Sequence, residues 1–378
     1  MCGVVGGFVD PDILAAMLGR IQHRGFMSAG IATNRWFWRS EGSVQNLIRE
    51  HSGTWAGNYG IAHTRYKTDD ESQIQPVIRL RDGHTFDAFA FNGQVTDGDT
   101  DKIFLAVRSR DLNSVRGAYS YIYLDSLRCT IRAGRDRYGF HPLFYSPSRR
   151  VVASETAADL YIDDWKPIEP GTEIDVSNGN VLSRIPAQPA RCFFEWIYFS
   201  AVQSQFDELS VYSARKDMGR LLALRETVRD ADFIVPVPDS GIAAAEAMAE
   251  ELGIPLRMAL YRDRLAERTF INEGGCSSKY IIIPEALRGK IILVDDSIIR
   301  GATMNHLVPR LQHYCDEVHV RITCPKITHA CRYGIHITGA GAHDIESADS
   351  VEFLEPEDVR LVPGTCRACV NGKYPDEN

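Results

Sequence analysis

The pattern of hydrophobic and polar residues changes character once along the chain. Up to about residue 164, short runs rich in β-branched and aromatic residues recur between turns, and we expect one early helix at residues 11–22. Such runs are typical of strands. Those expected are residues 4–8, 59–62, 88–91, 119–124, 129–133, 143–145 and 151–154. This pattern predicts a β-rich, layered first half.

Turn-forming residues then crowd together at 169–172 and 177–180, and a Pro-containing stretch follows at 185–190, so we interpret this region as a linker. After Cys192, helical and strand patterns alternate. Helices are expected at 210–227, 242–252 and 304–314, and strands at 233–237, 257–260, 291–294 and 317–323. Such alternation predicts a mostly parallel sheet. We therefore expect two domains, residues 1–185 and 186–378.

One segment of the second half carries distinctive chemistry. An apolar strand at 291–294 ends in Asp295 and Asp296, and a turn rich in hydroxyls and glycine, Ser297 to Thr303, leads into a helix. Open α/β sheets bind ligands at the carboxyl ends of their strands, and helix N-termini attract phosphate. Carboxylates suit ribose hydroxyls and Mg²⁺, whereas backbone amides suit a phosphate. The segment therefore predicts a sugar-phosphate site.

The N-terminus offers a second candidate site. Cys2 follows Met1 directly, so removal of the initiator methionine, rather than of a propeptide, would leave its thiol beside its own α-amine. An α-amine titrates at roughly 7.7 to 8.0, close enough to neutral pH to accept the thiol proton directly or through water. Cys2 is therefore a candidate nucleophile with a built-in base.

Composition narrows the function classes. The formal charge is -8, with 42 basic and 50 acidic residues and no long block of either sign, which gives no electrostatic case for nucleic-acid binding. No apolar run of about 18 residues and no leader pattern is present, so we expect a soluble, cytoplasmic protein without a membrane span. The 9 cysteines are an odd number, which favours reduced thiols over a disulfide framework.

Several segments together resemble a known family. Cys2 and residues 22–31, 62–66 and 91–94 are similar to the N-terminal-nucleophile (Ntn) glutamine amidotransferase domain. Residues 233–243 and 290–303 resemble the amidophosphoribosyltransferases, which transfer ammonia from glutamine to phosphoribosyl pyrophosphate (PRPP). Further segments resemble that family in order, at 192–199, 210–215, 264–270, 331–335 and 369–375. The resemblance implies an α+β Ntn hydrolase αββα glutaminase domain followed by an α/β type I phosphoribosyltransferase domain.

The resemblance also implies the residues of the glutaminase. The catalytic set is Cys2, Asn92 and Gly93, and the glutamine-binding set is Arg24, Arg65 and Asp101. Asn92 and the Gly93 amide would form the oxyanion hole. Arg65 would pair with the α-carboxylate of glutamine, since guanidinium and carboxylate bond bidentately, and Arg24 would favour the thiolate. Either Asp99 or Asp101 could hold the α-amine, and we prefer Asp101.

For the second half the resemblance implies a PRPP site with Mg²⁺. The PRPP-binding set is Lys279, Asp295, Asp296, Ser297, Arg300, Gly301, Ala302 and Thr303. Ser240 would join Asp295 and Asp296 around the Mg²⁺ ion. Lys279 would contact pyrophosphate, a suitable place for a cation because the leaving group gathers negative charge. Arg264 and Arg268 are similar candidates.

Cys366 and Cys369, separated by two residues near the C-terminus, form a pair of candidate thiolate ligands for a metal site. Two more thiolates would complete a site, and spacing alone does not separate a zinc site from an iron–sulfur site. The resemblance is to the iron–sulfur-containing branch of the family, which implies that Cys192 and Cys331 complete a 4Fe-4S cluster. Such a cluster would fasten the C-terminal tail to the body of the protein.

The reaction implied is the first step of purine synthesis. Glutamine and PRPP would be the substrates, purine nucleotides are candidate inhibitors, and a homo-oligomer is expected. The chain departs from the family pattern at Phe26, Met27, His141, Trp196 and Leu265, and its glutaminase half is shorter. Two alternatives therefore stay open, a PRPP-sensing protein with a decayed glutaminase and an amidotransferase of a specialised pathway with a different phosphosugar acceptor.

Overall fold

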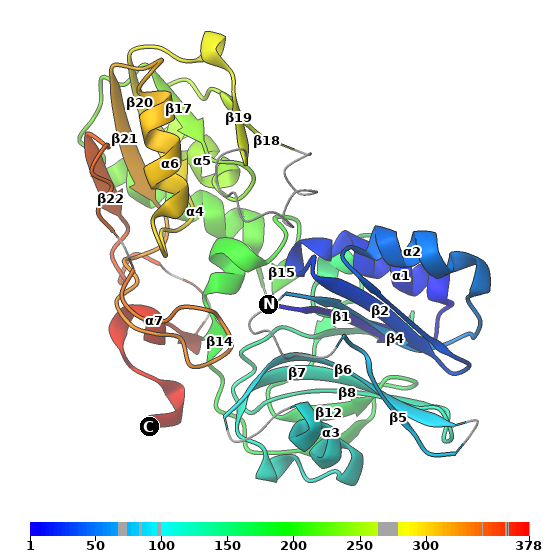
Figure 1. Cartoon of the computed structure of the whole chain (residues 1–378). Coiled ribbons are helices and arrows are strands. Elements are labelled where there is room, and N and C mark those ends of the chain that lie inside the picture. Colours follow the sequence, from blue (N-terminus) through cyan, green and yellow to red (C-terminus); the bar gives the residue numbers. More distant parts are fainter. Residues whose placement is uncertain are drawn as a thin grey trace.

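The computed structural model describes residues 1–66, 74–82, 85–96, 100–206, 208–263, 279–341, 343–359, 361 and 363–377. These residues form two halves, one built on antiparallel sheets and one on a parallel sheet (Figure 1). The N-terminus lies near the centre of the molecule, close to the junction of the two halves, and the C-terminal tail folds back beside that junction (Figure 1). None of the described helices is both long and apolar enough to span a membrane.

Two antiparallel sheets form the first half. The first sheet has the strand order β11-β9-β10-β1-β4-β2-β3. Its strands are β1 (Gly3–Gly7), β2 (Ser28–Thr33), β3 (Phe37–Glu41), β4 (Gly60–Arg65), β9 (Phe144–Ser146), β10 (Val151–Ala153) and β11 (Lys166–Pro167). The second sheet has the order β13-β12-β8-β7-β6-β5. Its strands are β5 (Val77–Leu80), β6 (Phe86–Val95), β7 (Gly117–Asp125), β8 (Thr130–Arg135), β12 (Thr172–Asp175) and β13 (Val181–Arg184).

The alternation of side chains along β6 and β7 explains how the layers stack. Ala88, Ala90 and Ile122 share one hydrophobic core with Val4 and Ile61 of the first sheet. The intervening residues, which include Phe89, Phe91, Tyr119, Tyr121 and Tyr123, point the other way and pack with the helix α3 (Thr100–Ser109). Helices α1 (Pro11–Arg20) and α2 (Val44–His51) cover the outer face of the first sheet. The predicted αββα layering is confirmed.

The expected helix at 11–22 and the expected strands are present, but two interpretations of the first half were wrong. Helices α2 and α3 were not predicted. The supposed linker at 169–190 instead contains the hairpin β12–β13, whose turn is closed by hydrogen bonds from Ser177 N to Asp175 Oδ1 (2.8 Å) and from Gly179 N to Asp175 O (2.7 Å). Gly179 has φ +76°, which explains the glycine in this turn.

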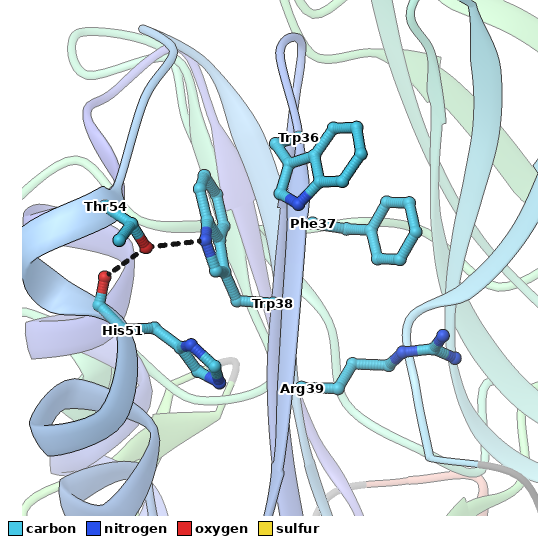
Figure 2. Close-up of a pocket in the computed structure, with 6 residues that line it drawn as sticks. All are labelled: Trp36, Phe37, Trp38, Arg39, His51 and Thr54. Atoms are coloured by element: carbon cyan, nitrogen blue, oxygen red, sulfur yellow. Dashed lines mark hydrogen bonds between the residues drawn. The ribbon is translucent and has the colours of Figure 1, made fainter. Parts of the chain in front are cut away.

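The first sheet ends in the free edge strand β3. A shallow, open pocket wraps around this edge and is lined by Trp36, Phe37, Trp38, Arg39, His51 and Thr54 (Figure 2). Inside it, Trp38 Nε1 donates a hydrogen bond to Thr54 Oγ1 (3.1 Å). None of the predicted site residues lines this pocket.

A four-stranded parallel sheet, in the order β17-β20-β21-β22, forms the second half. Its strands are β17 (Phe233–Pro236), β20 (Lys290–Asp295), β21 (Glu317–Ile322) and β22 (Ser350–Phe353). Helices α4 (Val211–Arg225) and α5 (Ile242–Leu252) cover one face and α6 (Ala302–Leu311) the other (Figure 1). The parallel sheet was predicted, whereas β22 was not. Two hairpins flank it, β15 (Gln205–Phe206) with β16 (Leu209–Ser210) and β18 (Leu260–Arg262) with β19 (Tyr280–Ile282).

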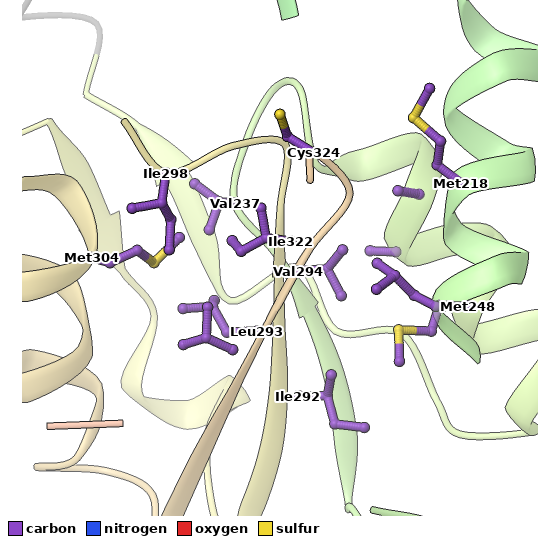
Figure 3. Close-up of a cluster of buried hydrophobic side chains, with 14 of the residues drawn as sticks. Met218, Val237, Met248, Ile292, Leu293, Val294, Ile298, Met304, Ile322 and Cys324 are labelled. Atoms are coloured by element: carbon purple, nitrogen blue, oxygen red, sulfur yellow. The ribbon is translucent and has the colours of Figure 1, made fainter. Parts of the chain in front are cut away.

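Neighbouring residues of β20 point to opposite helices. Leu293 points toward Met304 of α6, whereas Val294 points toward Met248 of α5 (Figure 3). All of these side chains are buried, as expected for a parallel strand that is covered on both faces.

The C-terminal tail is fastened by a short parallel ladder. Strand β14 (Arg191–Cys192) pairs with β23 (Thr365–Cys366), which places Cys192 opposite Cys366. The helix α7 (Ala368–Asn371) follows, and Thr328 N and His329 N donate hydrogen bonds to Cys369 O (2.9 and 3.0 Å). The tail therefore lies against both the junction and the segment after β21.

Candidate functional site

The N-terminal residues and the end of β6 form one compact site. The Cys2 backbone N donates a hydrogen bond to Asn92 Oδ1 (2.9 Å), so this carbonyl group points at the nucleophile. Asn92 is buried, and its Nδ2 has no hydrogen-bond partner among the described residues. A buried donor without a partner is costly unless a ligand completes it. The site therefore contains an unused amide donor beside the thiol.

Gly93 follows Asn92 in a conformation that favours glycine. Its φ is +148°, and a Cβ at this position would lie 2.1 Å from the carbonyl oxygen of Ala118 on β7. A side chain at this position would therefore require a shift of the β6–β7 ladder. The close packing holds the Gly93 backbone beside Asn92, as the predicted oxyanion hole requires.

Arg65 lies at the end of β4, next to Cys2. Gly3 pairs with Thr64 in the β1–β4 ladder, which makes Cys2 and Arg65 neighbours at the ends of adjacent strands. The Cys2 thiol lies 3.9 Å from the Tyr66 carbonyl oxygen, and the half-buried Arg65 is held by a hydrogen bond from Met27 N to its carbonyl oxygen (3.0 Å). Cys2, Arg65, Asn92 and Gly93 are thus brought together.

Arg24 occupies a different position from the one expected. Its side chain is buried between two carboxylates, with ion pairs to Glu155 and Glu195 (2.5 Å for Glu195), and it also donates to Ser200 Oγ (3.2 Å). Burial alone would lower the pKa of Arg24, but the charges of Glu155 and Glu195 raise it. The guanidinium is therefore a charged link between the two halves, and in this structure its donors are not presented to glutamine.

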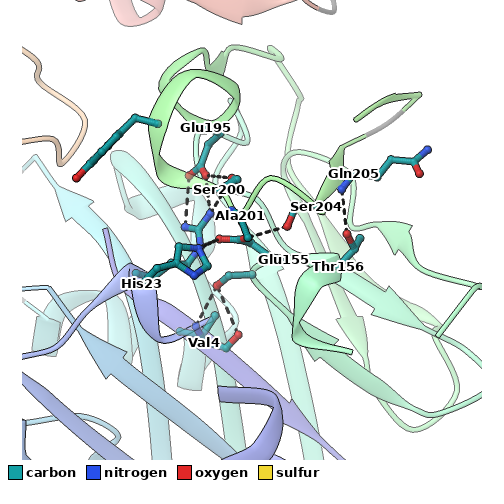
Figure 4. Close-up of polar contacts among 12 residues, drawn as sticks. Val4, His23, Glu155, Thr156, Glu195, Ser200, Ala201, Ser204 and Gln205 are labelled. Atoms are coloured by element: carbon teal, nitrogen blue, oxygen red, sulfur yellow. Dashed lines mark hydrogen bonds and ion pairs between the residues drawn. The ribbon is translucent and has the colours of Figure 1, made fainter. Parts of the chain in front are cut away.

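Glu155 is the centre of this polar network (Figure 4). Besides Arg24 it contacts His23 Nε2 (2.8 Å) and accepts hydrogen bonds from Ala201 N (2.9 Å) and Ser204 Oγ (2.6 Å). Although burial would raise its pKa, the charges of Arg24 and His23 hold the pKa well below the usual range. The network was not predicted, because no motif marks Glu155 and the 192–199 segment that contains Glu195 gives no sign of its partner.

The surroundings of the N-terminus favour neutral groups. Burial and, to a smaller extent, the charge of Arg24 lower the pKa of the Met1 amino group to about 6, while the charges of Cys2 and Glu195 oppose the shift. Burial also lowers the pKa of His63 and His141 to about 3. Because both imidazoles are neutral at pH 7, they add no positive charge beside the N-terminus. An amine placed here accepts a proton less readily than one in water.

The structure does not bring Asp101 to this site. Asp101 lies in the first turn of α3 and forms an ion pair with Arg79. Because α3 covers the face of the second sheet that carries Phe89 and Phe91, Asp101 and Asn92 lie on opposite faces. The alternative, Asp99, lies outside the described residues.

The second site lies at the carboxyl end of β20. Asp295 ends the strand, and the side chain of Asp296 accepts hydrogen bonds from Ser240 and Ser297, the latter at 2.5 Å. Burial raises the pKa of Asp295, and the negative charge of Asp296 raises it further. Ser240, Asp295 and Asp296 are thus brought together, as predicted. Two adjacent carboxylates that repel each other favour a cation between them.

The loop after Asp296 ends at the N-terminus of α6. Gly301, with φ +69°, precedes the helix, which begins at Ala302, two residues before the predicted start. Arg300 and Ala302 are exposed and Thr303 is half-buried, so the loop is open to solvent. Lys279 lies close enough for its charge to oppose the rise in the pKa of Asp295. Arg264, Arg268 and Leu265 lie outside the described residues.

Tyr198 lies between the two sites. It belongs to a π-helical turn, Glu195–Phe199. Partial burial of its phenol and the negative charge of Asp296 raise its pKa to about 12, and Tyr66, the neighbour of the Cys2 thiol, adds to the rise. Groups of both sites are therefore close enough to Tyr198 to shift its pKa, which indicates that the two sites approach each other at the junction.

The four predicted cluster cysteines meet where the tail joins the body. Cys366 and Cys369 are buried, and Cys192 and Cys331 are half-buried. Burial raises the pKa of the Cys192 thiol, and the charges of Cys331, Cys366 and Cys369 raise it further. Within the described residues, however, no three His, Cys, Asp or Glu side chains already stand in a metal-holding arrangement. The thiols are neighbours, since Cys192 pairs with Cys366 in the β14–β23 ladder and the charges of Cys331, Cys366 and Cys369 act on Cys192.

Comparison with known proteins places these sites in one family. No protein-family model matches the chain. The amidophosphoribosyltransferase of Methanocaldococcus jannaschii is 31% identical over 466 aligned residues, covering 100% of this chain and 98% of the relative. That of Archaeoglobus fulgidus is 32% identical, covering 99% and 98%, respectively. Both alignments are longer than the 378 residues of this chain, so the relatives contain segments that it lacks.

Comparison with solved structures leads to the same family. The glutamine PRPP amidotransferase of Bacillus subtilis, complexed with ADP and GMP, superimposes with a TM-score of 0.88 at 29% identity, covering 99% of this chain and 97% of that one. A structure described as the allosteric regulatory enzyme of purine biosynthesis superimposes with a TM-score of 0.86 at 28% identity, covering 99% and 96%. The predicted fold and family are thereby confirmed. By its identity to these relatives over its whole length, the chain belongs to the amidophosphoribosyltransferase family.

Proposed function

We propose that this chain hydrolyses glutamine at Cys2 and transfers the ammonia to PRPP, giving 5-phosphoribosylamine, pyrophosphate and glutamate, the first step of purine synthesis. The observation that carries the proposal is the unpartnered, buried Asn92 Nδ2 beside Cys2. The Asp295–Asp296 pair in the other half of the same chain supplies the acceptor site. We set the boundary between the two domains near residue 185, just after β13.

In the glutaminase, the chemistry follows from the groups around Cys2. After removal of Met1, the α-amine of Cys2 would take the thiol proton, and the thiolate would attack the amide carbon of glutamine. Asn92 Nδ2 and the Gly93 amide would then bind the developing oxyanion. Such donors typically contribute about 3 to 4 kcal/mol. The α-ammonium group would return its proton to the amide nitrogen, which leaves as ammonia, and the neutral α-amine would then activate the water that hydrolyses the thioester.

Arg65 would hold the α-carboxylate of glutamine, because its position beside Cys2 suits a bidentate ion pair. Arg24 would instead hold the two halves together beside the N-terminus through its ion pairs with Glu155 and Glu195. The sequence offers Asp99 and Asp101 for the α-amine of glutamine, and in this structure Asp101 forms an ion pair with Arg79.

In the phosphoribosyl half, Ser297 to Thr303 would bind the 5′-phosphate through backbone amides and the N-terminus of α6. Ser240, Asp295 and Asp296 would hold Mg²⁺, and this donor set fits that hard, oxygen-seeking ion. Bound Mg²⁺ would neutralise charge on the pyrophosphate. Lys279, which lies near Asp295, would add a second positive charge as the C1–O bond breaks.

The four junction cysteines would hold a 4Fe-4S cluster. Four neighbouring thiols suit either an iron–sulfur cluster or zinc. The choice of an iron–sulfur cluster comes from the resemblance to the iron–sulfur-containing branch. The cluster would link β14, the 331–337 segment and the tail structurally. Iron counting and the visible absorbance of protein purified without oxygen test this assignment, and a colourless protein with zinc would contradict it.

Purine nucleotides are the proposed inhibitors, since the Bacillus subtilis neighbour is complexed with ADP and GMP, and a homo-oligomer is the proposed assembly.

The test of the function is a joint product assay. The protein is mixed with glutamine, PRPP and Mg²⁺, and glutamate, pyrophosphate and the aminated sugar are measured together. Release of neither glutamate nor pyrophosphate would indicate a PRPP sensor, and an aminated product other than 5-phosphoribosylamine would indicate a specialised pathway.

A further inference from the structure

The 331–337 loop of the second half lies against the oxyanion strand of the first. A Cβ added to Gly334 would lie 3.6 Å from Gln94 Cβ and 3.7 Å from both Gln94 N and the Gly93 carbonyl carbon. These distances are ordinary van der Waals contacts. The backbone of Gly334, with φ +93°, therefore packs beside the two residues that follow Asn92.

On the side away from β7, side chains rather than a strand hold this part of β6: Phe91 N donates a hydrogen bond to Gln75 Oε1 (2.7 Å), and His63 Nε2 lies 3.1 Å from Phe91 O. β5 pairs with β6 only from Phe86 to Phe89, whereas β7 pairs with β6 along its whole length to Val95. Beyond Phe89, the described residues thus give β6 a ladder partner on one side only. Gly334 contacts the strand within this singly paired stretch, next to the predicted oxyanion donor Gly93.

Tyr333 anchors the loop to the glutaminase half. Its ring stacks on Phe140, with centroids 4.0 Å apart and an interplanar angle of 20°. Both rings pack with Ala118, the residue opposite Gln94 in the β6–β7 ladder. Because the Ala118 carbonyl oxygen also lies beneath Gly93, the Tyr333 ring supports the far side of the same ladder.

The other end of the loop is fixed by the tail. Tyr333 N donates a hydrogen bond to Cys331 Sγ (3.3 Å), Cys331 N donates to Ile337 O (2.9 Å), and the Tyr333 hydroxyl donates to Asp376. The Arg332 guanidinium lies 3.6 Å from the centroid of the Tyr374 ring. Groups outside the glutaminase half, on the loop itself and on the tail, therefore also hold the loop in place.

We propose that the 331–337 loop braces the end of β6 and that Tyr333 and Gly334 are positioning residues for the oxyanion hole of Asn92 and Gly93. The inference rests on the proposed glutamine hydrolysis. It goes further by making this activity depend on a loop of the phosphoribosyl half. A displacement of about 1 Å in catalytic donors can lower a rate by about 10²-fold, so a brace at this point has a measurable effect on kcat.

The test compares Tyr333→Ala and Tyr333→Leu with Tyr333→Phe in the full chain. Tyr333→Phe keeps the stacked ring and loses only the bond to Asp376. We expect Tyr333→Ala and Tyr333→Leu to lower kcat for glutamine hydrolysis by about tenfold or more, with KM for glutamine within about twofold, because Arg65 is untouched. Amide hydrogen exchange should become faster at residues 90–95, and Tyr333→Phe should behave like the wild type.

Ammonia-dependent release of pyrophosphate from PRPP is the internal control and should stay within about twofold of the wild type. A wild-type protein without glutaminase activity would refute the proposed function rather than the brace. If the wild type is active and Tyr333→Ala and Tyr333→Leu change neither kcat nor exchange at 90–95, the brace is wrong. It is also wrong if glutamine-dependent and ammonia-dependent activities fall together, since Tyr333 would then support the whole fold.

Discussion

At the scale of single residues, the sequence identifies most of the side chains around Cys2 but not the direction in which each of them points. Cys2, Asn92 and Gly93 are marked by short motifs, and they meet as expected. Arg24 and Glu195 each lie in a family-like segment, yet nothing in the sequence links the two segments or marks Glu155, so these buried ion pairs were not predicted. A motif identifies the residue types that a site needs, whereas the direction of a long side chain depends on partners that are distant in sequence.

The Arg24–Glu155 pair makes stability depend on pH. The pKa of Glu155 is lowered in the folded protein, whereas an unfolded Glu titrates at about 4.3. A group with a depressed pKa stabilises the fold above its unfolded pKa and loses that contribution as pH falls toward its folded pKa. The contribution of Glu155 should therefore be complete at pH 7 and should decline below about pH 4.

Glu155→Gln should lower the free energy of unfolding at pH 7 by about 3 to 5 kcal/mol, because it leaves part of the buried Arg24 charge unpaired. The difference from the wild type should shrink as the pH falls below about 4. Urea unfolding at pH 7, 5, 4 and 3 measures this, with the exposed Glu285→Gln as the matched control. Equal stability of Glu155→Gln and the wild type at pH 7 would show that the pair is not stabilising.

At the scale of elements, the predictions were best where a strand or helix has a pattern of its own. β1, β4, β7, β17, β20, β21, α1, α4 and α5 were expected within a few residues of their observed bounds. The hairpin β12–β13 was missed because its turn residues, Ser177 to Gly179, are also typical of linkers. β22 was missed because it is a short edge strand whose pairing with β21 is long-range.

Close packing between α4 and α5 gives a prediction at this scale. A Cβ on Gly219 of α4 would lie 2.1 Å from the Ala244 carbonyl oxygen of α5, so the helices pack backbone to backbone. Gly219→Ala should lower the free energy of unfolding by about 1 to 3 kcal/mol, although Ala favours a helix by about 1 kcal/mol over Gly. Thermal unfolding measures the change. Gly53→Ala, which meets open space, is the control, and equal loss in both variants would contradict the packing argument.

At the scale of the whole molecule, the junction joins the two chemistries. Arg24 of the glutaminase half pairs with Glu195 at the start of the second half, Tyr198 lies near both Tyr66 and Asp296, and the 331–337 loop reaches back to β6. These contacts link segments far apart in sequence, which explains why sequence patterns predicted both sites but not their connection.

The central claim is that one chain holds a nucleophile for glutamine and a separate acceptor site for PRPP. The most direct test measures glutamate and pyrophosphate from the wild type, Cys2→Ala and Asp296→Asn, with glutamine or an ammonium salt as the nitrogen source. We predict that Cys2→Ala releases no glutamate but retains ammonia-dependent pyrophosphate release, and that Asp296→Asn loses pyrophosphate release with both nitrogen sources. Glutamate release by Cys2→Ala, or undiminished pyrophosphate release by Asp296→Asn, would contradict the account.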